Sequence, residues 1–262
     1  MTGHLLSRLS RVRAIAKALG SGWAFAKTEA NSHGCIVGYS ARDQQRRGNE
    51  RAAERSNPFR AFAENKPVGN ALFKWDHYLE IYNSYFANRL GKEINVLEVG
   101  VRGGGSLDMW AAVFGPACRV YGVDIDPECT RYEAANRHIL IGDQGDRAFW
   151  ARVKATLPPL DVVIDDGSHV PEHQIATFEE LWPMLRPGGV YLIEDVHGCF
   201  NPFLAYVVGL MAHMNGGASN GPSEVVPTPM QRWVEGIHVH PFCVVIEKRE
   251  TPLEVLCAKE WQ

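Results

Sequence analysis

The 262-residue sequence has no uninterrupted apolar run of the roughly 18 residues that a membrane-spanning helix needs. Its formal net charge is only −3, so no global field favours nucleic acid or a membrane surface, and an anionic partner would need a local patch. The six cysteines include no C-x-x-C pair, and we interpret them as reduced, buried, small apolar residues of a cytoplasmic protein. These cysteines are Cys35, Cys118, Cys129, Cys199, Cys243 and Cys257.

Acidic residues are also missing from residues 1–28, which carry five basic ones. Leu5, Leu9 and Val12 begin a set of apolar residues that would share one face of a helix. The pattern favours a basic helix docked on the domain, or a start of the sequence that is ill defined, and an amphipathic targeting presequence is the alternative. Residues 41–60 are polar and charged, which predicts a linker or a solvated helix. We therefore divide the chain into an N-terminal extension with its linker, residues 1–65, and a folded domain, residues 66–262.

From residue 70 the pattern changes to that of a folded domain. Aromatic and apolar residues recur at helical spacing over 71–90, which predicts a helix with an aromatic face. Short β-branched runs then alternate with segments of helical pattern, as is typical of βαβ units around a parallel sheet buried on both faces. The runs are Ile94–Val99, Arg119–Val123, His138–Ile141, Asp161–Ile164 and Val190–Ile193, and the helical segments are 106–114, 127–136, 145–156 and 171–185.

The last two apolar runs break this rhythm. Trp233–His240 and Phe242–Lys248 are separated by Pro241 alone, which leaves no room for a crossover helix. Two strands joined so tightly must be antiparallel. The sequence therefore predicts an α/β fold, with a doubly wound, mostly parallel, seven-stranded, Rossmann-like sheet that ends in an antiparallel hairpin.

A glycine-rich turn follows the first run, where the chain reads Glu98-Val-Gly100-Val-Arg-Gly103-Gly104-Gly105-Ser106. Glycines permit a tight turn and a close approach of a ligand to the backbone, and the helix that starts near Ser106 presents free N–H groups. The spacing differs from the G-x-G-x-x-G of dehydrogenases. Glu98 could contact a cationic amino-acid ligand, and Asp124, at the end of the second run, could accept both hydroxyls of a ribose.

Asp143 follows the third run and has two readings. Its carboxylate could accept a hydrogen bond from the exocyclic amine of adenine, which we favour in this context. Read without that context, Asp143 is as readily interpreted as the N-cap of the helix at 145–156.

Acidic residues and histidines gather after the fourth and fifth runs. The first group reads Asp165-Asp166-Gly-Ser168-His169, and the second includes Glu194, Asp195 and His197. Because the carboxyl ends of neighbouring parallel strands meet at one edge, so many charges there must be paired, metal-bound or catalytic. Asp166 and Asp195 offer the oxygen ligands that suit Mg²⁺, and His169 would serve as general base for a hydroxyl group.

Simpler structural roles remain open for several of these residues. Asp165 would contact the cofactor or cap a turn, and Ser168 would cap the helix that begins at Pro171. A zinc site at His169 and His173 is disfavoured because no cysteine accompanies the pair. His173 reads as a helix-surface residue, and His197 as a lid residue or a support for the site.

Taken together, these motifs resemble one family, the metal-dependent sugar O-methyltransferases of macrolide biosynthesis, which share the class I methyltransferase fold. The resemblance spans residues 72–248 and implies S-adenosylmethionine (SAM) as the methyl donor, Asp166 and Asp195 as Mg²⁺ ligands and His169 as the base. It implies further that Gln144 belongs to the cofactor site. The family's third ligand is acidic and lies on the helix before the first strand, where this chain has Asn83, with Glu80 one turn away. The motifs that carry the resemblance are Glu98-x-Gly100-x-x-x-Gly104-Gly105-Ser106-Leu107-x-x-Trp110, Tyr121-Gly122-x-Asp124-Ile125, Gly142-Asp143-Gln144, Ile164-Asp165-Asp166-Gly167-Ser168-His169 and Arg186-Pro187-Gly188-Gly189-x-Tyr191-x-Ile193-Glu194-Asp195.

We therefore expect a SAM-dependent O-methyltransferase that acts on a hydroxylated small molecule, such as a sugar or another secondary-metabolite intermediate. The acceptor pocket is expected from residues 196–232 and the aromatic helix, with 215–231 as a lid or an ordinary loop. Three alternatives are an NAD(P)-dependent oxidoreductase, a SAM-binding protein without activity and a nucleic-acid methyltransferase. The sequence does not identify the acceptor, and it leaves a homo-oligomer open.

Overall fold

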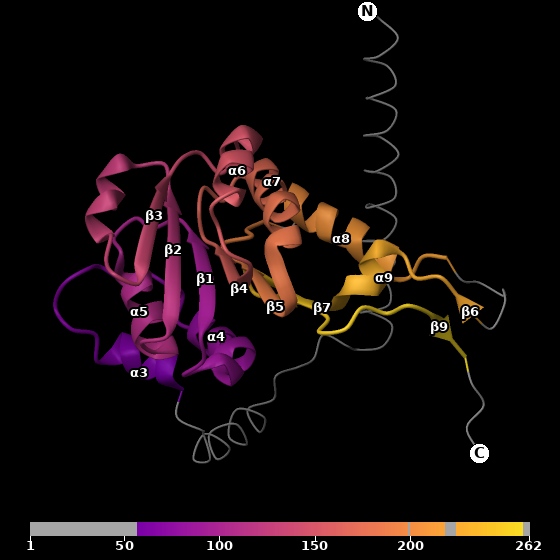
Figure 1. Cartoon of the computed structure of the whole chain (residues 1–262), viewed down its shortest axis with the longest axis horizontal. Coiled ribbons are helices and arrows are strands. Elements are labelled where there is room, and N and C mark those ends of the chain that lie inside the picture. The colour runs from indigo at the N-terminus through magenta and orange to yellow at the C-terminus, as the bar shows by residue number, and fades with distance from the viewer. Residues whose placement is uncertain (1–56, 199, 218–223, 259–262) are drawn as a thin grey trace, which may run out of the picture. The chain divides into compact units, whose positions relative to one another are not determined.

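The computed structural model describes residues 57–198, 200–217 and 224–258 (Figure 1). The predicted basic helix, most of the predicted linker, Cys35 and Cys199 lie outside these residues. So does the central part of the loop at 215–231.

Seven strands form one sheet: β1 (Ile94–Val99), β2 (Cys118–Asp124), β3 (Arg137–Ile141), β4 (Leu160–Asp165), β5 (Leu185–Ile193), β7 (Val234–His240) and β8 (Cys243–Lys248). They agree with the apolar runs of the sequence to within a residue at each end, except that β5 begins earlier than the predicted run Val190–Ile193. Their order is β3-β2-β1-β4-β5-β8-β7, with β3 and β7 at opposite edges (Figure 1). The first five are parallel, whereas β8 is antiparallel to both β5 and β7. All six residues of the central β1 are buried, as expected for a strand covered on both faces. The predicted fold is confirmed.

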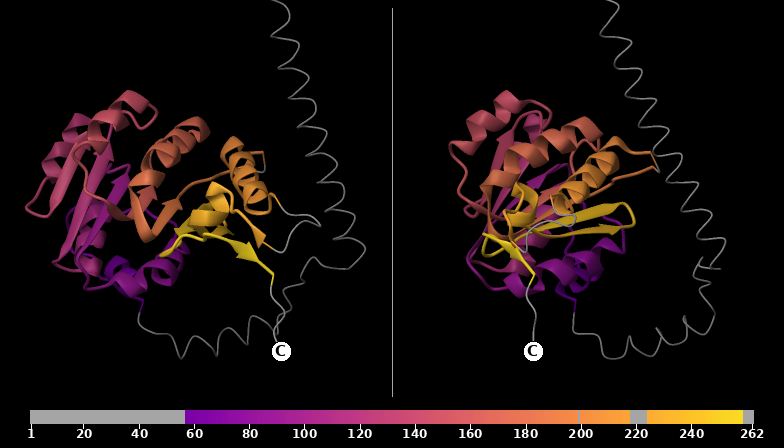
Figure 2. Two further views of the ribbon diagram at one scale, coloured as in Figure 1. Left: turned by 45° about the vertical axis from the view of Figure 1, so that its right-hand side comes forward. Right: turned by 90° about the vertical axis from the view of Figure 1, so that its right-hand side faces the viewer.

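Helices cover both faces of this sheet (Figure 2). One face packs against α3 (Pro58–Glu64), α4 (Tyr78–Phe86) and α5 (Gly105–Phe114). The other packs against α6 (Arg147–Lys154), α7 (Pro171–Leu181) and α8 (Pro202–Met214). Beyond α8, the short strands β6 (Glu224–Val225) and β9 (Leu256–Cys257) pair with each other, and helix α9 (Pro229–Trp233) leads into β7.

Helix α3 is attached to the rest of the domain by a cluster of five aromatic rings, of which Phe59 belongs to α3 itself. The Phe59 ring packs edge-on against Tyr82, Phe86, Trp110 and Phe114, with centroid distances of 5.9 to 6.2 Å. All five side chains are fully buried. Helix α3 thus belongs to the folded core, although it precedes residue 66, where we placed the domain boundary. The division at that residue stays a prediction.

Two predicted helices differ most from the sequence pattern. Helix α4 begins at Tyr78 rather than at residue 71, because residues 71–77 cross the glycine-rich turn, where the Ala71 carbonyl accepts a hydrogen bond from Gly105. The segment 127–136 contains only a 3₁₀ helix, Pro127–Tyr132, capped by the Asp126 side chain.

The four cysteines among the described residues are free thiols. Cys118, Cys129 and Cys243 are buried as predicted, whereas Cys257 is exposed on β9, so the prediction of burial was wrong there. Within the described part of the chain, every helix is too short or too polar to cross a membrane.

Candidate active site

A cavity of about 390 Å³ opens at the carboxyl ends of β1, β2, β4 and β5. Open α/β sheets bind their ligands at this edge. The cavity brings together most of the residues that the sequence singled out: Gly100, Gly103, Ser106, Asp124, Asp143, Gln144, Asp166, His169 and Asp195. Four others do not line it: Glu98, Gly104, Gly105 and Asp165.

The glycine-rich turn contains two kinds of glycine. Gly100 has φ +94° and forms part of the cavity wall, close to the backbone of Asp166 and Gly167 in the turn that follows β4. Gly104 and Gly105 serve packing instead, because a Cβ would lie 2.6 Å from the Tyr132 ring at the first and 2.4 Å from the Ala71 carbonyl oxygen at the second. We expected both glycines to hold the cofactor. In the structure they instead allow the turn and the start of α5 to pack closely against Tyr132 and Ala71.

Asp124 fixes the shape of the turn. Its Oδ2 accepts hydrogen bonds from the backbone N–H groups of Val101 and Arg102 at 2.8 and 2.9 Å. Its Oδ1 accepts one from Asp126 at 2.9 Å. The carboxylate still borders the cavity, so the predicted contact with ribose hydroxyls is compatible with this support of the loop.

Asp143 is not the N-cap of the following helix, which was one of its two readings. Helix α6 begins at Arg147, and its cap is Asp146, whose carboxylate accepts from the N–H of Ala148. Asp143 accepts from Gly145 at 2.8 Å and borders the cavity. The alternative role, at the adenine ring, therefore remains the one to test.

Asp165 and Gln144 form a buried polar pair beneath the cavity. The Gln144 amide donates to Asp165 Oδ1 at 3.0 Å, and its oxygen accepts from the N–H of Ser168. Because Asp165 is fully buried, its pKa is raised to about 7, although the bonds from Gln144 and Gly167 oppose the rise. Asp165 thus supports the turn after β4 and does not line the cavity, which favours the turn-capping reading over the predicted contact with the cofactor.

Ser168 also differs from its predicted capping role, because Val170 is the N-cap of α7 and no side chain caps that helix. The Ser168 hydroxyl lies 3.1 Å from His173 Nδ1. His173 lines the cavity rather than the outer helix surface.

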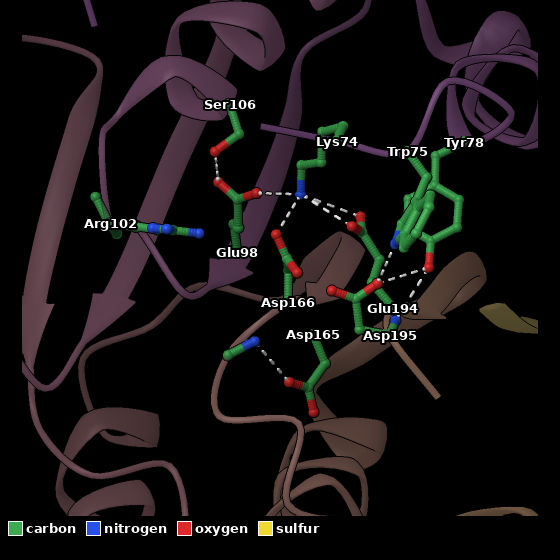
Figure 3. A network of polar contacts seen from close by, with 12 residues as sticks. Lys74, Trp75, Tyr78, Glu98, Arg102, Ser106, Asp165, Asp166, Glu194 and Asp195 are labelled. Carbon is green, nitrogen blue, oxygen red and sulfur yellow. Dashed lines mark hydrogen bonds and ion pairs between the residues drawn. The ribbon is translucent and has the colours of Figure 1, made fainter. Parts of the chain in front are cut away.

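Lys74 lies at the centre of a charge cluster that the sequence did not indicate (Figure 3). Its ammonium donates to Asp166 Oδ2 at 2.6 Å, to the two Glu194 oxygens at 3.1 and 3.2 Å and to Glu98 Oε1 at 3.3 Å. The three carboxylates come from the ends of three different strands, β1, β4 and β5. A lysine within an apparent helix of aromatic residues gave no local signal of this role.

Burial dominates the electrostatics of this cluster. Burial by itself would lower the pKa of Lys74. The attraction of Asp166, Glu194 and Glu98 outweighs this effect and raises the pKa well above its ordinary value, so the ammonium stays charged. Burial raises the pKa of Glu194 to about 8, against the opposing attraction of Lys74. Burial also raises the pKa of Glu98, whose other oxygen accepts from the Ser106 hydroxyl at 2.7 Å.

Tyr82 donates a buried hydrogen bond to Glu194 Oε1 at 2.6 Å. We expect Tyr82→Phe to lower the free energy of unfolding by about 1–3 kcal/mol, because the substitution leaves a buried carboxyl oxygen without this donor. Tyr206→Phe is the control, since its hydroxyl makes an exposed 3.3 Å bond to Glu179. Urea unfolding of both variants measures the difference, and equal losses would contradict the importance of the buried bond.

Asp195 is held by aromatic residues from the segment before β1 (Figure 3). Trp75 Nε1 and the Tyr78 hydroxyl donate to Asp195 Oδ1 at 2.9 and 3.0 Å. His169 Nε2 lies 3.5 Å from Asp195 Oδ2, and His197 Nε2 lies 3.6 Å from Oδ1.

Asp166, His169 and Asp195 each offer one ligand atom, and these atoms lie within 4.8 Å of one another. The two carboxylates supply the oxygen ligands that Mg²⁺ or Mn²⁺ prefers, and the His169 imidazole lies beside them. Glu80, considered above as a third ligand, instead accepts from Arg60 at 2.9 Å, and neither Glu80 nor Asn83 lines the cavity.

The backbone is strained at this edge of the sheet. His169 has φ +56° and Asp195 has φ +54°, a region that residues other than glycine seldom adopt. Such conformations persist only where the surrounding structure imposes them, and they concentrate at functional sites.

A second, shallower hollow of about 510 Å³ adjoins the cavity, and His169 and Asp195 line both. Phe200, which is 81% exposed, contributes to its wall. Beside it, the rings of Trp75, His197 and Phe242 lie with centroids 4.5 to 6.3 Å apart. A molecule in the second hollow and one in the cavity would therefore meet at His169 and Asp195.

Comparison with known proteins shows which families and relatives the chain is similar to. The methyltransferase domain family matches residues 97–196. The chain is 33% identical over 191 residues to 8-demethyl-8-alpha-L-rhamnosyl tetracenomycin-C 2'-O-methyltransferase of Streptomyces olivaceus, covering 66% of this chain and 50% of the relative. It is 40% identical over 128 residues to mycinamicin VI 2''-O-methyltransferase of Micromonospora griseorubida, covering 46% and 32%. The chain thus spans half the length of these relatives or less.

Among solved structures, the MycE methyltransferase of the mycinamycin pathway, in complex with Mg, SAH and mycinamycin VI, superimposes with a TM-score of 0.62. The two chains are 26% identical, and the match covers 83% of this chain and 61% of the other. Residues 97–196 therefore form a methyltransferase domain, and the chain resembles the sugar O-methyltransferases of macrolide and tetracenomycin biosynthesis.

Proposed function

We propose that this protein is a SAM-dependent O-methyltransferase that acts on a hydroxyl group of a small molecule, a sugar or another secondary-metabolite intermediate. The observation that carries the proposal is the junction of two hollows at His169 and Asp195. A methyl donor in the cavity and an acceptor in the second hollow would meet beside a potential base and a cluster of metal ligands. The names of the relatives support the choice of acceptor class.

In this proposal the glycine-rich turn, Asp124 and Asp143 hold the donor. Asp124 would accept from the ribose hydroxyls, and Asp143 from the adenine amine. Gln144 would contribute indirectly, because its side chain holds the turn at Asp165 and Ser168 in place. The acceptor oxygen attacks the methyl carbon, the carbon–sulfur bond breaks, and S-adenosylhomocysteine (SAH) leaves. His169 takes the hydroxyl proton. Placing the nucleophile in line with the methyl group would supply much of the rate gain.

Asp166 and Asp195 would hold a divalent metal ion, for which the donor set described above is suited. When bound, the ion would orient the acceptor hydroxyl and lower its pKa. The hydrogen bonds from Trp75 and Tyr78 keep Asp195 directed toward this position. The same contacts would fix the distance from Asp195 to His169.

Two rival functions differ from the proposal in what they bind. An NAD(P)-dependent oxidoreductase would bind NAD⁺, but the glycine spacing and the antiparallel β7–β8 edge disfavour it. A SAM-binding protein without activity would bind SAH tightly and show no effect of metal on methyl transfer.

The experiment that tests the proposal is a calorimetric titration of the purified chain with SAH, with and without Mg²⁺, and with NAD⁺ as the control ligand. We expect SAH to bind with micromolar or better affinity and NAD⁺ not to bind. Methyl transfer to a panel of deoxysugar-bearing acceptors, with and without Mg²⁺, then tests the chemistry. Binding of NAD⁺ without binding of SAH would refute the proposed function.

We also propose a cytoplasmic location, which the free thiols of the described cysteines favour. The net charge of −3 supports a small-molecule acceptor rather than a nucleic acid. The number of subunits can be measured directly by light scattering.

A further inference from the structure

The connection between α3 and α4, residues 65–77, brings one buried lysine to the edge of the sheet. The side chain of Lys74 is 4% exposed, and that of Glu194 is 1% exposed. A lysine is seldom buried so completely unless it is paired. Here one ammonium faces carboxylates from three strands, so it is the positive charge around which the ends of β1, β4 and β5 are arranged (Figure 3).

Asp166 belongs to two groups at once. Its Oδ2 accepts the shortest of the lysine's hydrogen bonds, 2.6 Å, and with Asp195 it is also one of the two carboxylates proposed to hold a metal ion. A divalent ion bound by Asp166 would therefore lie within a few ångströms of the Lys74 ammonium, and two cations so close repel each other strongly in a buried site. Glu194, the other strong acceptor, is likewise occupied by Lys74 and Tyr82.

We propose that Lys74 is a tethered cation that competes with a divalent metal ion for Asp166 and keeps Glu194 from binding the ion, so that the native chain binds metal weakly. This inference rests on the metal role of Asp166 and Asp195 in the proposed function. Without the ammonium, Asp166 and Glu194 are released, and the site has an excess of carboxylates that a divalent ion neutralises. Lys74 thereby sets how strongly the protein depends on metal.

The test compares Mn²⁺ binding, followed by the electron paramagnetic resonance of the free ion, in the native chain and in Lys74→Met. We expect the dissociation constant for Mn²⁺ to fall by about tenfold or more in the variant. Lys92→Met is the matched control, because Lys92 is an exposed lysine that precedes the opposite end of β1, and it should leave the constant unchanged.

Lys74→Met could leave too many buried charges for the chain to fold. The double variant Lys74→Met/Glu98→Gln removes one of them and keeps Asp166, Glu194 and Asp195. In both variants Mn²⁺ should raise the melting temperature more than it does in the native chain, because the ion takes the place of the ammonium.

Three results would overturn the proposal: equal Mn²⁺ affinity in native and Lys74 variants, no Mn²⁺ binding by any chain, or no gain in melting temperature with Mn²⁺ in either Lys74 variant. SAH titration of the native chain runs in parallel. A failure of SAH to bind would count against the proposed function, whereas the Mn²⁺ comparison would still decide the role of Lys74.

Discussion

Replacing His169 is expected to lower kcat for methyl transfer by about 10²–10⁴-fold while SAH affinity stays within about twofold of the native value. The imidazole lies at the junction of the two hollows, 3.5 Å from Asp195, where a proton would leave the acceptor hydroxyl in the proposed reaction. It makes no part of the glycine-rich turn or of the Asp124 network, so loss of the side chain should affect the chemical step rather than donor binding.

The choice of variant matters because His169 has φ +56°. Alanine is strained in that region, whereas asparagine tolerates it and cannot act as a base near neutral pH. His169→Asn should therefore keep the native melting temperature, and His169→Ala should lose about 1 kcal/mol of stability. Exposed His213, on α8, provides the control, since His213→Ala should retain full activity. Native turnover in His169→Asn would remove the base assignment.

Gly100→Ala is expected to destabilise the protein by about 3 kcal/mol or more and to abolish SAH binding. At φ +94°, a Cβ at this position would lie 2.0 Å from the backbone carbonyl oxygen of Asp166 and 2.7 Å from its carbon. Both neighbours are main-chain atoms of the β4 turn, so relief requires β1 and β4 to separate where the cavity is formed. Donor and metal residues would move together.

A matched glycine on α8 provides the control for this substitution. A Cβ at Gly209 would meet nothing within 4 Å, and alanine is the better helix former by about 1 kcal/mol. Gly209→Ala should thus leave the stability unchanged or raise it slightly. Urea unfolding and SAH titration measure both variants, and a Gly100→Ala protein as stable as the native chain would contradict the close approach.

The sheet was predictable because its inner parallel strands, β1 and β4, are buried on both faces and are therefore apolar over most of their length. The run Ile94–Val99 agrees with β1 at both ends. Helix α4 was predicted too long because aromatic spacing continues through Trp75, whose indole in fact reaches the site to bind Asp195. The spacing of apolar residues indicates which side chains are buried, but not whether they are buried by a helix or by an extended segment. It therefore could not distinguish the face of a helix from a segment that crosses the glycine-rich turn.

The candidate site was predictable where its residues follow strand ends, as with Asp166 and His169. It was not predictable where tertiary packing decides. Asp165 stands next to Asp166, yet it points into the protein because successive residues of a strand face opposite sides. Lys74 lies 92 residues from Asp166 and 120 from Glu194, a separation that leaves no local pattern.

That separation also bears on how the protein folds. The ammonium of Lys74 joins the ends of strands that lie far apart along the chain, and contacts of long sequence separation form late and slowly because a large loop must close first. During synthesis, β5 must leave the ribosome before the lysine can find all its partners. Formation of the Lys74 cluster therefore requires β5 to have paired beside β4, whereas β7 and β8 can join the sheet later.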